Sequence, residues 1–175
     1  MSDNMVIRET TADELPQVLA LYPLAFPDEE LRPVVSGLLA GEAEVLSLAV
    51  FKGEALVAHV LFTIFSGDGD ISAGALLAPL GVLPDHQSQG VGNALVRNGL
   101  ERLDAMGIAQ VFVLGDPAYY GRFGFQPEQF VLTPYPLPEE WRDAWQSMLF
   151  PGRTPLAPGQ CLLPASWMEP ALWAP

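Results

Sequence analysis

Cysteine and positive charge are both scarce in this sequence. Its 175 residues include one cysteine, Cys161, which cannot form an internal disulfide and lacks the paired spacing of zinc or redox sites. Eight lysine and arginine residues stand against 21 aspartate and glutamate residues, so the formal net charge is −13. A surface of this sign repels nucleic acid and acidic lipid headgroups. We therefore expect no nucleic-acid partner, and a cationic or neutral small molecule is easier to accommodate.

Long apolar runs and metal-site spacings are also missing. No stretch approaches the roughly 20 apolar residues that a membrane-spanning helix needs, and the first residues lack the basic and apolar regions of a secretory signal. His59 and His86 are too far apart to form a recognisable metal site, and Asp68 with Asp70 are too few for a calcium loop. We therefore expect a cytoplasmic protein with no membrane partner and no metal.

Hydrophobic residues make up half of the composition, which is enough for one full core. We predict a single domain over residues 1–175, with its core over residues 5–125. Residues 126–175 hold ten of the seventeen prolines and all four tryptophans. This composition predicts an irregular segment with only short strands or helical turns, which wraps the core.

The hydrophobic pattern of the core predicts alternating strands and helices. It first predicts a short extended opening at 6–7, a helix entered through the capping-box spacing of Thr11 and Glu14, and a second helix over 31–39 ended by Gly41. Strands over 45–51, 55–65 and 74–83 follow, with a turn at 67–70. A helix over 92–103 and a strand over 108–114 complete the core. Because the last strand follows a strand and a helix, it should lie parallel to the strand that ends near Leu83. We therefore predict an α/β (α+β) fold with a mixed, mostly antiparallel sheet.

The connection from that strand into the next helix is suited to holding a phosphate. A helix start leaves backbone N–H groups unpaired and carries a partial positive charge, so it attracts anions. Glycines at 90 and 92 remove side chains that would keep a diphosphate away from these groups. No Gly-Lys-Ser/Thr follows, which excludes a P-loop, and Leu95 stands where a dinucleotide fingerprint needs a third glycine. The glycines alone leave tight packing as an equal alternative.

The full spacing Gln87-x-x-Gly90-x-Gly92 after an apolar strand resembles the coenzyme A signature of the GNAT superfamily of N-acetyltransferases. The order of elements over residues 5–125 is also similar to that family. The resemblance implies the GNAT fold, with helices flanking a sheet whose central parallel strands are splayed, and acetyl-CoA as cosubstrate. It implies a pyrophosphate held chiefly by backbone N–H groups and a pantetheine arm beside the preceding strand end. The implied cofactor-binding residues are Leu80, Gly81, Val82, Gln87, Ser88, Gln89, Gly90, Val91, Gly92 and Asn93. For Gly81, accommodation of a packing neighbour is the alternative.

A second string resembles the last helix of the family, in which a tyrosine precedes a Gly-Phe pair by four residues. Tyr120 has this spacing to Gly124 and Phe125, so the resemblance implies that Tyr120 is the catalytic proton donor to the departing thiolate. A tyrosine hydroxyl has a pKa near 10 and stays protonated at neutral pH. Tyr119 as the donor, or Tyr120 as a packing aromatic, are the alternatives.

After the fifth strand, Gly115-Asp116-Pro117 stands where the family often has an asparagine that contacts the cofactor. This departure is similar to a poorly characterised branch of predicted N-acetyltransferases that carries Tyr-Tyr-x-x-Phe-Gly-Phe.

No spacing identifies the base that deprotonates the amine. Asp28, Glu29 and Glu30 are candidates, followed by Asp116, and a solvated acidic face is the alternative for each. His86 is expected at the surface and His59 as a hydrogen-bonded core residue.

The resemblance implies direct transfer of an acetyl group from acetyl-CoA to a primary amine, with no acyl-enzyme on Cys161. The proline- and tryptophan-rich segment favours a small-molecule amine, because it would close the acceptor groove. Two alternatives stay open: an acetyltransferase for protein N-termini or lysines, and a coenzyme A-binding sensor or partner module without turnover. Tyr120 favours the enzyme. The sequence does not determine the oligomeric state, and a homodimer is one alternative.

Overall fold

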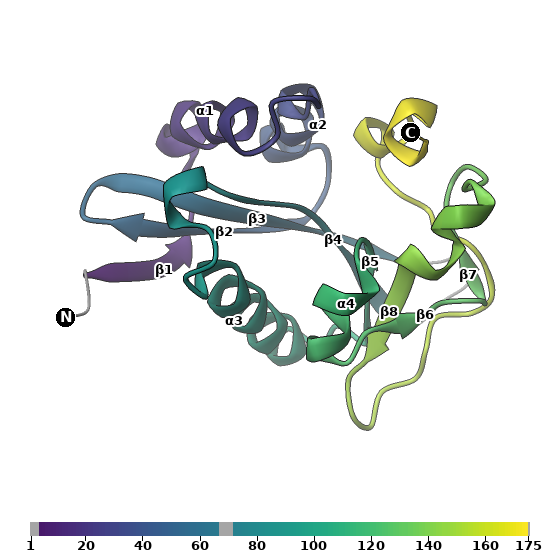
Figure 1. Ribbon diagram of the computed structural model, residues 1–175. Coiled ribbons are helices and arrows are strands. Elements are labelled where there is room, and N and C mark those ends of the chain that lie inside the picture. The colour runs from purple at the N-terminus through teal and green to yellow at the C-terminus, as the bar shows by residue number, and fades with distance from the viewer. Residues whose placement is uncertain (1–3, 67–71, 175) are drawn as a thin grey trace.

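The computed structural model describes residues 4–66 and 72–174, and a seven-stranded mixed sheet forms its centre (Figure 1). The strand order is β1-β2-β3-β4-β5-β8-β6. These strands are β1 Met5–Glu9, β2 Val45–Lys52, β3 Ala55–Ser66, β4 Ala73–Val82, β5 Gln110–Leu114, β6 Gln126–Pro127 and β8 Trp145–Leu149. β4 and β5 run parallel and the other neighbouring pairs run antiparallel, which confirms the predicted mixed sheet. The predicted turn at 67–70, with Asp68 and Asp70, lies outside the described residues.

Helices cover both faces of the sheet (Figure 1). α1 Leu15–Ala25 and α2 Arg32–Gly37 lie on one face, while α3 Val91–Ala105 and α4 Pro117–Tyr120 pack against the other. Each face has its own buried apolar cluster, and the central strands are buried on both sides, which explains their nearly continuous apolar runs. In the described part of the chain, no helix combines the length and apolar character needed to cross a membrane.

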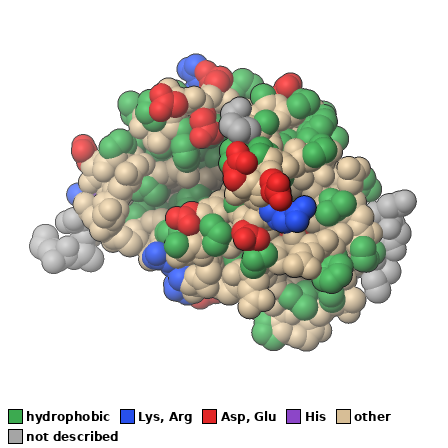
Figure 2. Space-filling model, turned by 45° about the vertical axis from the view of Figure 1, so that its right-hand side comes forward, with side chains coloured by type: hydrophobic (Ala, Val, Ile, Leu, Met, Phe, Trp, Pro, Cys, Tyr) green, Lys and Arg blue, Asp and Glu red, His purple; other side chains and the backbone are tan. Residues whose placement is uncertain are grey.

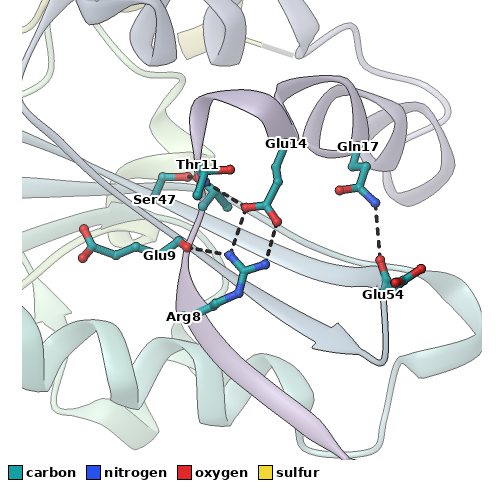
Figure 3. Close-up of polar contacts among 8 residues, drawn as sticks. Arg8, Glu9, Thr11, Glu14, Gln17, Ser47 and Glu54 are labelled. Carbon is teal, nitrogen blue, oxygen red and sulfur yellow. Dashed lines mark hydrogen bonds and ion pairs between the residues drawn. The ribbon is translucent and has the colours of Figure 1, made fainter.

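The entry into α1 is fixed by the predicted capping box (Figure 3). The Thr11 backbone N–H donates to Glu14 Oε1 at 2.8 Å, and Arg8 on β1 donates to both carboxylate oxygens of Glu14, at 2.9 and 2.6 Å. The hydrogen bonds from Arg8 lower the pKa of Glu14 to about 2. Gln17 Nε2 donates to the Glu54 carbonyl at 3.4 Å, so α1 is tied to the edge strand and to the β2–β3 turn.

The parallel strands separate after a short paired stretch. β4 pairs with β5 only from Gly74–Leu76 to 110–112. Beyond that point the β3–β4 register shifts, so that Ala78 and Pro79 oppose Leu61 alone. Such a bulge bends a strand and accommodates proline, which has no N–H to donate. β4 then continues to Val82 without β5 beside it, which confirms the splayed parallel pair.

The C-terminal segment, residues 126–174, joins the sheet through β6 and β8 and forms a second small sheet from β7 Val131–Leu132 and β9 Gly159–Gln160. Indole N–H groups anchor it: Trp145 donates to the Val131 carbonyl at 2.8 Å, Trp167 to Thr63 Oγ1 at 3.1 Å, and Trp173 to the Trp167 carbonyl at 2.9 Å. Its last turns lie near α2 in Figure 1. The segment therefore packs onto the α1–α2 face of the sheet.

Candidate functional site

The connection from β4 to α3 presents the first backbone N–H groups of α3. Gly90 is the N-cap, with φ of +79°, and the first bond of the helix runs from the Ala94 N–H to the Gly90 carbonyl at 3.0 Å. The N–H groups of residues 91–93 precede that bond and have no partner within the helix. The left-handed backbone favours glycine at 90, and a methyl group placed there would meet no atom within 4 Å. This open, N–H-rich turn fits a diphosphate.

A cavity of about 510 Å³ lies against this turn. Seven of the ten predicted cofactor-binding residues line it, namely Leu80, Val82, Gln87, Ser88, Gly90, Gly92 and Asn93. Gln87 Nε2 also donates to the Val82 carbonyl at 3.0 Å, which fixes the turn to the strand end. We call this the first cavity.

The side chains of the other three predicted residues turn elsewhere. Gly81 faces α1, where a methyl group would stand 2.9 Å from Leu21 Cδ2, so close helix packing explains this glycine. Val91 is buried in the apolar cluster beneath α3, and Gln89 is exposed and donates to the Asp85 carbonyl at 3.2 Å. Only their backbones are left to contact a cofactor.

Two polar residues of the first cavity were not predicted as site residues. Arg122 places its guanidinium 4.6 Å from the centre of the Tyr119 ring and donates to Asn93 Oδ1 at 3.4 Å. Its position three residues after Tyr119 on a helical turn is the sequence signal for this contact. His86 is half-buried rather than at the surface, and its Nδ1 is buried without a hydrogen-bond partner among the described residues. A buried polar atom in a cavity wall calls for a ligand or water as its partner.

A second cavity, of about 830 Å³, adjoins the first, because Phe26 and Leu80 line both. Its walls come from the loop after α1, the splayed ends of β4 and β5, Tyr120, and the C-terminal segment. On the face drawn in Figure 2, acidic side chains gather around a hollow whose walls include hydrophobic side chains. The separation of β4 and β5 thus leaves space on both sides of the strand end.

The two neighbouring tyrosines divide between the cavities. Tyr119 lines the first cavity, where its hydroxyl lies 3.1 Å from the position of a methyl group on Gly92, and Tyr120 lines the second. Their rings meet edge to face at 4.9 Å. Burial raises the pKa of both hydroxyls, and the neighbouring Tyr119 raises that of Tyr120 further. Tyr120 is therefore a neutral hydrogen-bond donor at physiological pH.

Gly115 leaves room for the ring of Tyr120. A methyl group on Gly115 would overlap Cε2 of the Tyr120 ring and stand 2.9 Å from Cδ2. The backbone cannot easily retreat, because the Gly115 N–H donates to the Ala144 carbonyl at 2.9 Å and its carbonyl accepts from Gln146 Nε2 at 3.0 Å. Any larger residue here, including asparagine, would displace Tyr120.

The candidate bases fall into different environments. Asp28, Glu29 and Glu30 are exposed on the wall of the second cavity. Glu30 accepts from Arg32 Nε and Nη2 at 2.9 and 2.6 Å, and these bonds lower the pKa of Glu30 to about 2, which makes it a weak base. Asp116 instead caps α4 by accepting from the Ala118 N–H at 2.9 Å.

His59 and Cys161 are buried parts of the core. His59 is bonded to the Tyr22 hydroxyl through Nδ1 at 2.5 Å and to Ser47 Oγ through Nε2 at 2.8 Å, which confirms its predicted core role. Burial lowers the pKa of His59 to about 3 and raises that of Cys161 to about 12. Neither group is suited to act as base or nucleophile.

Comparisons with known proteins agree with this geometry. The Acetyltransferase (GNAT) domain family matches residues 6–127. The uncharacterized N-acetyltransferase YjhQ of Escherichia coli K12 is 40% identical over 151 residues, which span 82% of this chain and 77% of YjhQ. The uncharacterized N-acetyltransferase YhbS of the same strain is 32% identical over 123 residues, 70% of this chain and 74% of YhbS.

Two solved structures are similar over nearly the whole chain. A GNAT family acetyltransferase from Brucella melitensis, in complex with acetyl-CoA, superimposes with a TM-score of 0.76 and 25% identity over 94% of this chain and 98% of its own. E. coli YhbS in complex with CoA superimposes with a TM-score of 0.81 and 25% identity over 94% of this chain and 92% of its own. The chain therefore belongs to the GNAT family of acetyltransferases.

Proposed function

We propose that this protein moves an acetyl group from acetyl-CoA to a primary amine of a small molecule by direct transfer. The amine nitrogen forms a bond to the thioester carbonyl carbon as the C–S bond breaks, giving the N-acetylated amine and CoA. One amine proton passes to a base or to water, the thiolate takes the hydroxyl proton of Tyr120, and Tyr120 regains a proton from water. The observation that carries the proposal is the junction of the two cavities at Phe26 and Leu80, between an anion-binding helix start and Tyr120.

In this proposal the N–H groups of residues 90–93 hold the pyrophosphate, with Ser88, Gln89 and Gln87 shaping the turn, and residues 80–82 run beside the pantetheine arm. Tyr120 serves the leaving thiolate. Burial makes its hydroxyl a weaker acid, so its first contribution is a hydrogen bond to the developing negative charge. Complexes of the two superimposed relatives with acetyl-CoA and CoA support the choice of donor. We include the C-terminal segment in the same single domain.

Calorimetry with acetyl-CoA tests the donor site. Gly90→Ala has a matched control in Gly152→Ala, because Gly90 and Gly152 have φ of +79° and +76° and no atom within 4 Å of an added methyl group. Both variants carry the same backbone strain, but only Gly90→Ala and the bulkier Gly92→Val should lose affinity for acetyl-CoA. Equal affinity in all three variants, or no binding by the wild type, would contradict the donor site.

Thiol release in the presence of amines separates the alternatives. A small-molecule transferase releases CoA with free amines, and Tyr120→Phe should lower this rate by about 10²–10⁴-fold. Faster release with peptides than with any free amine would favour the protein acetyltransferase. Tight acetyl-CoA binding with no release on any amine or peptide would favour the sensor. Full turnover by Tyr120→Phe would remove Tyr120 from the mechanism.

A further inference from the structure

The second cavity has a largely apolar wall that the C-terminal segment completes. Trp141, Trp167, Leu172 and Trp173 contribute from that segment, opposite Leu76 and Leu114 on the splayed strands. Trp167 and Trp173 are 5% and 3% exposed, and their indole N–H groups are already donated to Thr63 and to the Trp167 carbonyl. Only small parts of these two rings therefore reach the cavity, and they hold the wall in place, while the half-buried Leu114, Trp141 and Leu172 present more of its apolar surface.

Charge in this cavity has one sign. Asp28, Glu29 and Glu30 line it, and no lysine or arginine is among the described residues of its lining. Arg32 neutralises Glu30, but no ion pair to Asp28 or Glu29 forms within residues 4–66 and 72–174. Two uncompensated carboxylates beside an apolar wall attract a cation and repel a carboxylate.

The position of the acids also orients an occupant. Phe26, which lines both cavities, lies two residues before Asp28, so the acidic loop begins at the junction with the first cavity. Trp167 and Trp173 line the same cavity from the other end of the chain, and the turn that ends at Trp167 packs against α2, which begins directly after the acidic loop. A bound amine would thus have its ammonium end at the acidic loop and its body against the apolar side chains of the cavity.

Polar groups available to other acceptor classes are few. Apart from the acids, the lining side chains able to form further hydrogen bonds are Tyr120 and Trp141, since Trp167 and Trp173 have used their N–H groups. The side chains of this wall would offer an amino sugar few partners for its hydroxyls, and an amino acid would bring its carboxylate to the acids without a cation. A second ammonium group would be buried among apolar side chains.

Resting on the proposed acetyl transfer, we propose that the acceptor is a lipophilic monoamine: one primary amine on an aromatic or long aliphatic body, without a carboxylate. Its ammonium group is drawn to Asp28 and Glu29, and its body packs against the apolar wall that the C-terminal segment completes. The cavity of about 830 Å³ has the size range of sites for small molecules.

Steady-state thiol release with matched amines tests this inference. 2-Phenylethylamine should have a kcat/KM about 100-fold above that of phenylalanine, which differs by one carboxylate. It should also exceed putrescine, glucosamine and a lysine peptide. If phenylalanine, putrescine or glucosamine reacts as well as 2-phenylethylamine while acetyl-CoA binds normally, the inference is overturned and the proposed function survives. If the lysine peptide reacts as well, the inference is overturned and the protein acetyltransferase is favoured. Failure of the wild type to bind acetyl-CoA would overturn both.

Charge variants test the acidic wall. Asp28→Asn with Glu29→Gln should raise KM for 2-phenylethylamine about tenfold, and Asp28→Lys should shift the preference toward phenylalanine. Glu101→Lys, which makes the same charge change on the exposed side of α3, is the control and should leave the preference unaltered. An equal shift in the control would attribute the effect to net charge and overturn the inference. If no amine is turned over, binding is tested by thermal unfolding of the CoA-bound proteins. 2-Phenylethylamine should then raise the Tm of the wild type more than the Tm of Asp28→Asn, and equal increases in Tm overturn the inference.

Discussion

Gly115 offers a way to move the Tyr120 ring without removing its hydroxyl. In Gly115→Ala, the added methyl group would overlap the ring, which Tyr119, Phe123 and Phe125 surround at centroid distances of 4.9, 6.3 and 5.8 Å. Overpacking of this kind destabilises a protein by about 1–3 kcal/mol. For a domain of this size, Tm should fall by about 2–4 °C per kcal/mol.

The same displacement should act on catalysis. A shift of about 1 Å in a catalytic group can lower turnover about 10²-fold. Gly115→Ala should therefore lose thiol release with an active amine while keeping its affinity for acetyl-CoA, because Gly115 and Tyr120 do not line the first cavity. Thermal unfolding, calorimetry and thiol release measure the three quantities separately.

Two further variants decide whether the clash with Tyr120 is the cause. Gly121→Ala adds a methyl group one residue after Tyr120, where φ is −56° and no atom lies within 4 Å, so it should match the wild type. In a Tyr120→Ala background, the stability cost of Gly115→Ala should disappear. If the cost persists there, or if Gly115→Ala is as active as the wild type, the argument that Gly115 makes room for the catalytic ring is refuted.

Three other predictions follow from contacts outside the tyrosine pair. Gly99→Ala should lower the free energy of unfolding by about 1–2 kcal/mol despite the better helix propensity of alanine, because the methyl group would overlap the Phe62 ring. Chemical unfolding measures this loss, and in a Phe62→Leu background Gly99→Ala should no longer cause it. Glu14→Gln should lower the free energy of unfolding by about 0.5–1 kcal/mol at neutral pH. Pairing with Arg8 lowers the pKa of Glu14 from 4.5 to about 2, so the stabilisation is complete above pH 4.5 and is lost as pH falls toward 2. The difference in unfolding free energy between variant and wild type should therefore close over this range, and a constant difference would contradict the ion pair. Arg122→Gln should weaken acetyl-CoA binding about tenfold at low salt and less at high salt, and a salt-independent loss would count against a charge contact.

The turn that we propose as the donor side of the site is visible in the sequence because its determinants are local. The turn from Gln87 to Gly92 is one strand-to-helix connection, and its proposed function depends on backbone N–H groups that glycine leaves accessible. The fold was predictable for a related reason: apolar runs and helical periodicity mark each element of the core. His59 was also assigned correctly to the core, although its partners Tyr22 and Ser47 lie 37 and 12 residues away.

Other features depend on contacts between distant segments and could not be predicted. The sequence marks Gly81 as a glycine near the cofactor, but the neighbour that requires it, Leu21, lies on α1. Arg122 was visible in the sequence, yet its approach to Asn93 depends on how α4 and the turn after it meet α3. The antiparallel pairing of β8 with β5 was hidden because prolines and tryptophans on either side made residues 126–175 look irregular.

The two cavities are therefore encoded at different places in the chain. The family match ends at residue 127, and the residues that line the first cavity all precede that point. The second cavity draws seven of its lining residues from 141–174, including Trp141, Trp167 and Trp173. Substitutions in that segment can alter the wall of the second cavity while leaving the helix start and Tyr120 in place. If that cavity holds the acceptor as we propose, relatives that share the turn from Gln87 to Gly92 can differ in acceptor, and the side chains of the C-terminal segment carry more weight in substrate assignment than the family does.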